Sequence, residues 1–200
     1  MKNQVQTCAV VAISGGGPTG VALAAGFPER VTRLVLAEAL TYPENRPNEP
    51  GYKNQTAFYG PTHALKWGLL GLISRLSPRA MARQTLVIFS THNPDDGLAK
   101  LSSEGIEKIA RFYRGRSSLK GALADSTHTV GAALLKSVCQ PVLVIHSRED
   151  NSVPFSHAQW SLEHIPQAEL CEAGITGHFF WVDPDFGRIS QRLVGFLQAG

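Results

Sequence analysis

The chain has 200 residues, 43% of them hydrophobic, which is enough to bury one sizeable core in a single domain. Its formal net charge of +3 comes from 19 basic and 16 acidic residues scattered along the chain, so no basic cluster favours nucleic-acid binding. The apolar runs contain charges and fall short of the roughly 20 residues of a membrane span, and residues 1–6 (MKNQVQ) do not begin a secretion signal.

The three cysteines, Cys8, Cys139 and Cys171, are far apart and set among apolar neighbours. This pattern favours buried free thiols over disulfides or a metal site. Together with the lack of a secretion signal, the free thiols predict a cytoplasmic protein. The charge distribution and the short apolar runs predict that neither a nucleic acid nor a membrane is a partner.

The first 40 residues predict a parallel strand–helix–strand unit. Residues 7–14 (TCAVVAIS) form a β-branched run without alternation, as in a strand buried on both faces. After a glycine cluster, Pro18 suits the first turn of a helix that ends near Gly26. Residues 31–40 (VTRLVLAEAL) predict a second buried strand.

The middle of the chain predicts a helical insertion. Its first part (TYPENRPNEPGYKN) is rich in Pro, Asn and Glu, which marks an exit from the regular core. Helical spacing recurs over residues 62–90 and 103–114, with capping residues at 93–96 (NPDD) between them. We therefore expect core segments at residues 1–40 and 136–200 and a helical cap at residues 41–135.

The last part of the chain returns to alternating strands and helices. Residues 141–147 (PVLVIHS) and 168–173 (AELCEA) predict strands, and residues 155–164 and 186–197 predict helices. This rhythm is typical of a parallel sheet with flanking helices. The predicted fold class is therefore α/β.

The glycine turn after the first strand can carry a nucleophile. Ser14 would lie on a strained strand-to-helix turn, where the small residues Ala12 and Gly16 let the backbone crowd past itself. The Gly15 amide would then face a developing oxyanion.

The same turn fits a dinucleotide fingerprint, and the segment GGGPTG looks like the opening of flavoprotein monooxygenases. Gly15-x-Gly17-x-x-Gly20 follows a strand and opens a helix, as in FAD- or NAD-binding Rossmann-type modules. Glu38 lies close to where an acidic residue would hold a ribose hydroxyl. The alternative function is therefore a dinucleotide-binding module.

Two downstream segments favour the interpretation of Ser14 as a nucleophile over a dinucleotide site. Residues 142–154 (VLVIHSREDNSVP) resemble the strand and acid loop of α/β-hydrolases, with Asp150 at the acid position. Residues 168–178 (AELCEAGITGH) resemble their final strand and Gly-His loop, with His178 at the base position. Residues 27–31 (FPERV) also look like this family, whose triads run in the order Ser, Asp, His.

The resemblance implies a serine hydrolase with a triad of Ser14, Asp150 and His178 and with Gly15 as an oxyanion donor. A neutral imidazole can take the serine proton and return it to the leaving group, while the Asp holds the other ring nitrogen. A small-molecule ester is the expected substrate, although the family also includes amidases and C–C hydrolases. No cofactor and no metal ion are expected.

Neighbouring residues leave some alternatives open. Glu149 adjoins the acid position, but the Asp-x-x-Val-Pro register favours Asp150. We expect His146 to be structural and Glu38 to be a polar residue at a strand end. The aromatic residues of the insertion either line a substrate pocket or form its core: Trp67, Phe89, Phe112 and Tyr113. The other histidines are expected to be solvated or capping: His63, His92, His128, His157 and His164.

The chain departs from the family at its beginning. The family's second oxyanion donor comes from a loop before the nucleophile strand, yet Ser14 lies 14 residues from the start. We therefore expect an N-terminally truncated form, whose first strand is an open sheet edge that favours self-association. Such a chain would be weakly active or inactive, and a noncatalytic remnant of the fold is a further alternative.

Overall fold

Four strands form one parallel sheet in the computed structural model, which describes residues 6–41, 62–115 and 130–199. The strand order is β1 (Cys8–Ile13), β2 (Val31–Ala37), β3 (Val142–Ser147) and β4 (Ala168–Ala173). In register, Ile13 pairs with Ala37, and Ala37 pairs with Ile145. The residues that follow these positions therefore meet at the carboxyl ends of the strands, which form one edge of the sheet.

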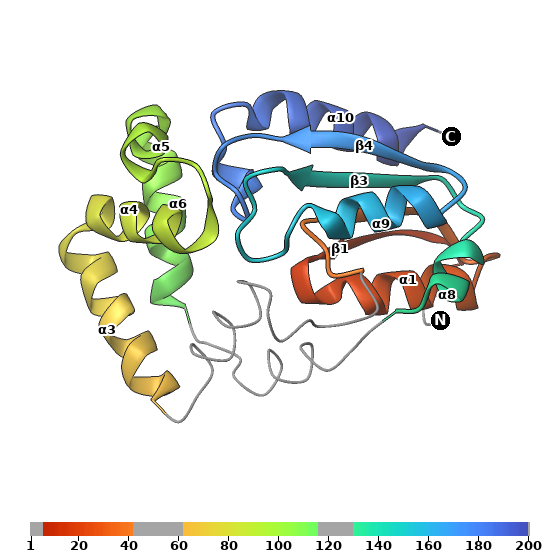
Figure 1. Cartoon of the computed structure of the whole chain (residues 1–200), viewed down its shortest axis with the longest axis horizontal. Helices are drawn as coiled ribbons and strands as arrows, with labels where there is room; N and C mark the ends of the chain where they lie inside the picture. Colours follow the sequence, from red (N-terminus) through yellow and green to blue (C-terminus); the bar gives the residue numbers. More distant parts are fainter. Residues whose placement is uncertain (1–5, 42–61, 116–129, 200) are drawn as a thin grey trace, which may run out of the picture.

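Helices cover both faces of the sheet (Figure 1). One face packs against α1 (Gly17–Gly26), α8 (Ala132–Lys136) and α9 (Ser156–His164), and the other packs against α10 (Phe186–Gln198). The predicted α/β fold class, with a parallel sheet and flanking helices, is confirmed.

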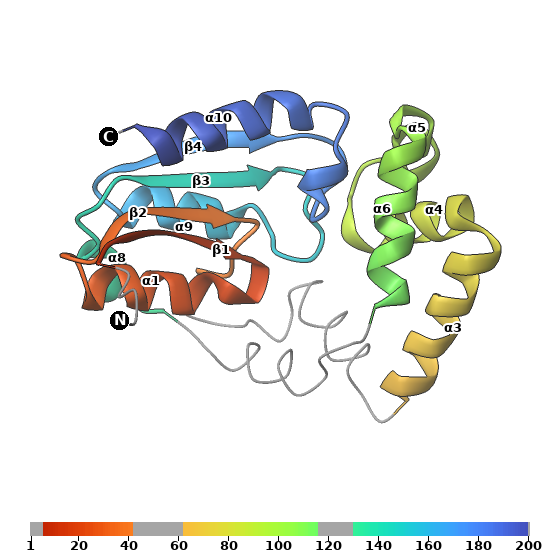
Figure 2. The same ribbon diagram turned by 180° about the vertical axis from the view of Figure 1, so that it is seen from behind.

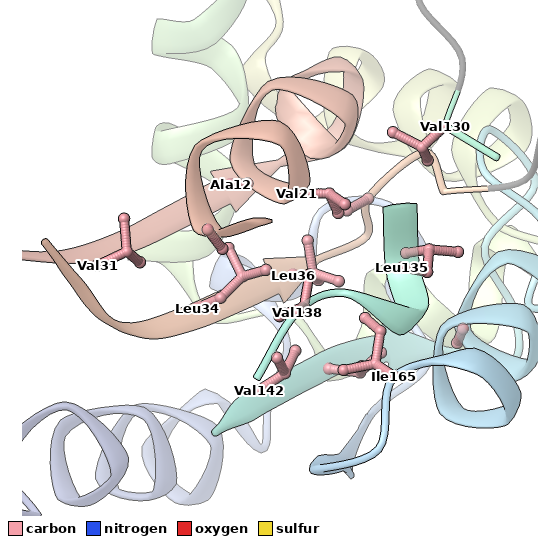
Figure 3. Packing of buried hydrophobic residues seen from close by; sticks show 14 residues of the cluster. Ala12, Val21, Val31, Leu34, Leu36, Val130, Leu135, Val138, Val142 and Ile165 are labelled. Atoms are coloured by element: carbon pink, nitrogen blue, oxygen red, sulfur yellow. The ribbon is translucent and has the colours of Figure 1, made fainter. Parts of the chain in front are cut away.

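Buried aliphatic side chains join the sheet to α1, α8 and α9 (Figure 3). Leu34 and Leu36 of β2 point into this cluster, whereas Val35 and Ala37 point into the cluster beneath α10. Each large aliphatic side chain buried in this way stabilises the fold by about 1.5–3 kcal/mol. Because β2 is buried on both faces, its sequence is almost continuously apolar.

Over residues 62–115, the described part of the insertion forms four helices beyond the carboxyl ends of the strands. They are α3 (His63–Leu76), α4 (Pro78–Phe89), α5 (Pro94–Lys100) and α6 (Ser103–Arg114). The arrowheads of β3 and β4 point towards this group in both views (Figures 1 and 2). Their own apolar cluster reaches Phe179 and Val182 in the segment after β4. The predicted helical insertion is therefore confirmed, and its helices lie beyond the ends of the strands.

Local sequence explains where these helices begin. Ser77 accepts a hydrogen bond from the Ala80 N–H and precedes Pro78, which needs no donor in a first turn. Asn93 and Ser102 cap α5 and α6 in the same way through their side-chain oxygens. The capping function predicted for residues 93–96 is confirmed.

β1 lies at the edge of the sheet in the described part of the chain. Its Val11 and Ile13 side chains are exposed by 46% and 45%, and neither belongs to the buried clusters on the two faces of the sheet. An apolar strand at a sheet edge favours association with another strand.

Several burial expectations are wrong. Cys8 and Cys139 are exposed free thiols, and only Cys171 is buried. His63 and His157 are buried rather than solvated, and His128 lies outside the described residues.

Within the ranges that the structure covers, no helix is long and apolar enough to cross a membrane.

Candidate active site

Ser14 lies where the chain turns sharply from β1 into α1. Its φ of 51° places a non-glycine residue in the left-handed region, which costs energy and is typical of functional turns. A 3-10 turn, η1 (Ser14–Gly16), joins the two elements, and half-buried Gly15 lies at the amino end of α1. The Ser14 carbonyl accepts hydrogen bonds from the N–H groups of Gly17 and Leu40, the second at 3.0 Å. These bonds hold the serine at the carboxyl edge of the sheet.

The backbone is crowded at Gly17 and Gly20, not at Gly16, which the sequence pattern suggested. A Cβ on Gly17 would lie 2.1 Å from the Leu40 carbonyl oxygen, and one on Gly20 would lie 2.5 Å from the Ala12 Cβ. A Cβ on Gly16 would meet no atom within 4 Å, so the prediction that Gly16 relieves crowding is wrong. Strand–helix packing therefore explains Gly17 and Gly20 without a dinucleotide.

Asp150 lies in the loop after β3, with its carboxylate fully buried. Its Oδ1 accepts hydrogen bonds from the backbone N–H groups of Ser152 at 2.7 Å and Val153 at 2.9 Å. Burial alone would raise the pKa of Asp150, but the positive charge and hydrogen bond of His178 lower this pKa below its usual value. The site therefore holds Asp150 as a carboxylate.

His178 lies in the loop after β4 and joins the other two predicted side chains. Its Nδ1 lies 2.7 Å from Asp150 Oδ2, and its Nε2 lies 3.0 Å from Ser14 Oγ. The preceding Gly177 has a φ of 59°, which lets the loop turn back towards the sheet edge. The structure thus brings the three side chains named from the sequence into one hydrogen-bonded row.

Glu149, the neighbour of the acid position, points elsewhere. Its carboxylate accepts a hydrogen bond from the Thr91 hydroxyl just after α4, whereas the His178 Nδ1 bonds to Asp150. The geometry therefore favours Asp150 over Glu149 as the acid.

The end of α4 holds both loops of the site, and sequence reasoning did not find this. The Phe89 carbonyl accepts hydrogen bonds from the N–H groups of His178 at 3.1 Å and Asn151 at 3.3 Å. The Asn151 side chain also donates to the Ile88 carbonyl at 3.1 Å. The Phe89 ring stacks against the imidazole, with 5.9 Å between ring centroids. The insertion thereby holds His178 in place as well as contacting its ring.

Asp183 organises the loop that carries His178, and sequence spacing offered no signal for it. It is buried, and its Oδ2 accepts hydrogen bonds from the Thr176 N–H and hydroxyl, each at 3.1 Å. A Cβ on Gly174 would lie 2.4 Å from the Asp183 carboxylate. A small residue at position 174 is therefore required for this contact.

Glu38 and His146 lie behind the row. Glu38 is fully buried with a φ of 45°, which ends β2 before the predicted Leu40, and its Oε1 accepts a hydrogen bond from the Ser147 N–H at 3.0 Å. Enclosed in this way, its carboxyl is not available to a ribose hydroxyl. Within the described ranges, Glu38, His146 and Asp150 are the one group of potential metal-ligating side chains whose atoms lie within 4.8 Å of one another.

Comparisons with known proteins agree with the fold. No family model matches the chain. It is 32% identical over 199 residues to the uncharacterized hydrolase YcgS of Bacillus subtilis, covering 98% of this chain and 70% of that protein. It is 29% identical over 176 residues to the pimeloyl-[acyl-carrier protein] methyl ester esterase of Nitrosomonas europaea, covering 82% of this chain and 61% of the esterase.

Solved structures show the same fold. An alpha/beta hydrolase fold protein from Nakamurella multipartita superposes with a TM-score of 0.71 at 22% identity, over 98% of this chain and 70% of that one. The esterase RhEst1 from Rhodococcus sp. ECU1013 superposes with a TM-score of 0.66 at 19% identity, over 98% of this chain and 66% of the esterase. With its sheet order and its relationship to the Bacillus hydrolase, the chain belongs to the α/β-hydrolase family.

Proposed function

We propose that the chain is a serine hydrolase that acts on small esters or related acyl substrates, with Ser14 as nucleophile, His178 as base and Asp150 as acid. One observation carries this proposal. Two consecutive hydrogen bonds, of 2.7 Å and 3.0 Å, join side chains that are 28 and 164 residues apart in the sequence. Nucleophile, base and orienting acid at these distances are the arrangement that acyl transfer requires.

Proton transfer follows from the hydrogen bonds. With the Nδ1–H of His178 donated to Asp150, the Nε2 lone pair faces the Ser14 hydroxyl. As Oγ attacks the ester carbonyl carbon, the hydroxyl proton moves to Nε2 and is then given to the departing alkoxide. The acyl group remains on Ser14 until a water molecule, deprotonated by the same imidazole, attacks it. The bond to Oγ then breaks, the imidazolium returns the proton to Oγ, and the acyl group leaves as a carboxylic acid.

The negative charge of the tetrahedral intermediate needs donors. Gly15, next to the nucleophile and at the amino end of α1, supplies one backbone N–H in this proposal. Losing one oxyanion donor typically costs about 10²- to 10³-fold in rate. With Gly15 as the single donor assigned among the described residues, we expect slow turnover.

Aromatic side chains beside the base favour an apolar acyl group. Phe89 stacks on His178, and Phe179 packs edge-on against both Phe89 and Phe112. Phe112 remains 47% exposed. Such a surface binds hydrocarbon or aromatic groups through the hydrophobic effect. Two relatives are named as esterases, and this supports an ester as the substrate.

A fluorophosphonate probe tests the proposal, because it labels only an activated serine. Covalent labelling of the purified chain is expected, with the label mapped to Ser14 by peptide mass spectrometry. The Ser14→Ala variant should lose the label. Ser137→Ala is the matched control, because Ser137 is exposed and its hydroxyl bonds only to the Leu134 carbonyl three residues earlier. An unlabelled wild-type chain, shown to be folded by circular dichroism, would refute the proposal.

A further inference from the structure

A buried carboxyl oxygen behind the candidate triad has no hydrogen bond assigned to it. Glu38 Oε1 accepts the Ser147 N–H, but Oε2 is fully buried and takes part in no hydrogen bond among the described residues. His146 Nε2 lies 3.3 Å from Oε2, but its hydrogen bond goes to the Val153 carbonyl oxygen at 2.9 Å. An ionised carboxylate oxygen left unpaired in such a place is very costly. A protonated oxygen would instead be a donor that needs an acceptor.

Asp150 is the acceptor at hand and is the better of the two carboxyls to carry a charge. Its Oδ1 receives two backbone N–H groups, and its Oδ2 faces the His178 Nδ1. Glu38 receives a single N–H group. Carboxylate oxygens of Glu38 and Asp150 lie within 4.8 Å of each other. Two carboxyl groups this close do not both ionise, so the proton stays on the one with fewer donors.

The surrounding groups supply no positive charge to balance a second carboxylate. His146 Nε2 lies 2.9 Å from the Val153 carbonyl oxygen, which makes this nitrogen an N–H donor to that carbonyl. Burial lowers the pKa of His146, so its ring is neutral. His157 is also held neutral by burial, and the Asp183 charge adds to the negative potential at Glu38.

We propose that Glu38 is a positioning residue that stays protonated and donates its Oε2 proton to Asp150, so that His178 faces one negative charge instead of two. The pKa values agree with this distribution. Burial, followed by the charge of Asp150, raises the pKa of Glu38 well above its usual value. A hydrogen bond from Glu38 is among the interactions that lower the pKa of Asp150.

A protonated Glu38 has two consequences for the neighbouring Asp150 and His178. A second negative charge would favour the imidazolium form of His178, which cannot accept the Ser14 proton. The donated proton also fixes the rotation of the Asp150 carboxylate towards the imidazole. A metal ion is a poorer occupant of the group, because His146 Nε2 and both Asp150 oxygens already have partners.

Only the catalytic consequence rests on the proposed function, so the first experiment needs no activity. The full chain is labelled with ¹³C at the glutamate side-chain carboxyls, and its ten glutamates are titrated by NMR. We expect one carboxyl resonance in its protonated position at pH 7. It should be absent from Glu38→Gln, and in Asp150→Asn its midpoint should move to lower pH, which identifies it even if Glu38→Gln does not fold. Ten ionised glutamates at pH 7 would overturn the proposal.

The second experiment separates a proton donor from a filler of space. Glu38→Met keeps the length of the side chain but removes the donor and the acceptor, and should slow fluorophosphonate labelling of Ser14 about tenfold. Glu38→Gln presents an amide N–H in place of the acid O–H, and should recover most of that rate and the wild-type pH midpoint of labelling. If Glu38→Gln and Glu38→Met moved that midpoint by the same amount, Glu38 would act through its charge and the proposal would fail.

Discussion

Replacing Gly177 with Ala provides a direct test of how the insertion holds His178. The residue has a φ of 59°, and an added Cβ would lie 2.2 Å from the Phe89 carbonyl oxygen. It would also lie 2.9 Å from the Glu149 carbonyl oxygen and from the Ser90 Cα. All three contacts are backbone atoms, so no flexible side chain can move aside.

The size of the effect follows from these contacts. Left-handed backbone costs a residue with a Cβ about 1–2 kcal/mol. The Phe89 carbonyl must also move away from the new methyl group, which breaks its hydrogen bonds to the N–H groups of His178 and Asn151. Each such bond contributes about 1 kcal/mol. Gly177→Ala should therefore lower the free energy of unfolding by roughly 3–4 kcal/mol, a large part of the usual 5–15 kcal/mol.

Urea unfolding followed by tryptophan fluorescence measures this loss, and fluorophosphonate labelling reports the position of His178. Gly68→Ala is the matched control, because a Cβ there meets no atom within 4 Å inside α3. Ala in a helix interior should raise stability by about 0.5–1 kcal/mol. If Gly177→Ala lost less than about 1 kcal/mol and kept the wild-type labelling rate, the argument from backbone contact would be refuted.

Three further results are expected. Burial, followed by repulsion from His146, lowers the pKa of His157 to about 4. The free energy of unfolding is therefore at its full value above pH 6.5 and falls by about 3 kcal/mol as the pH is lowered to 4. His157→Asn keeps an acceptor for the Thr41 N–H and should flatten this part of a pH series of urea midpoints; an equally steep loss would exclude His157 as its source. Asp183→Ala leaves the buried Thr176 N–H unpaired, so it should lower the free energy of unfolding by about 2–3 kcal/mol and abolish Ser14 labelling. Unchanged urea and labelling curves would show that the loop does not need this carboxylate. Val11→Lys places a charge on the exposed β1 edge and should reduce concentration-dependent self-association in sedimentation velocity; a monomeric wild-type chain would contradict the open-edge interpretation.

The sequence by itself predicted the helices and strands and the order of the candidate triad residues along the chain. The β-branched run before Ser14, the proline in the first turn of α1 and the caps of the inserted helices act over a few residues, so local preference was enough to predict them. The resemblance to the hydrolase family then singled out Asp150 and His178.

Tertiary structure alone decided which groups act together. The crowding of Gly17 against Leu40, the two hydrogen bonds to the Phe89 carbonyl and the burial of Glu38 beside Asp150 all depend on contacts between distant segments. Hydrophobic periodicity says which face of a strand is buried, but it does not say which strand ends become neighbours. The parallel register of β1, β2 and β3 sets those neighbours, because it brings the residues after Ile13, Ala37 and Ile145 to one edge.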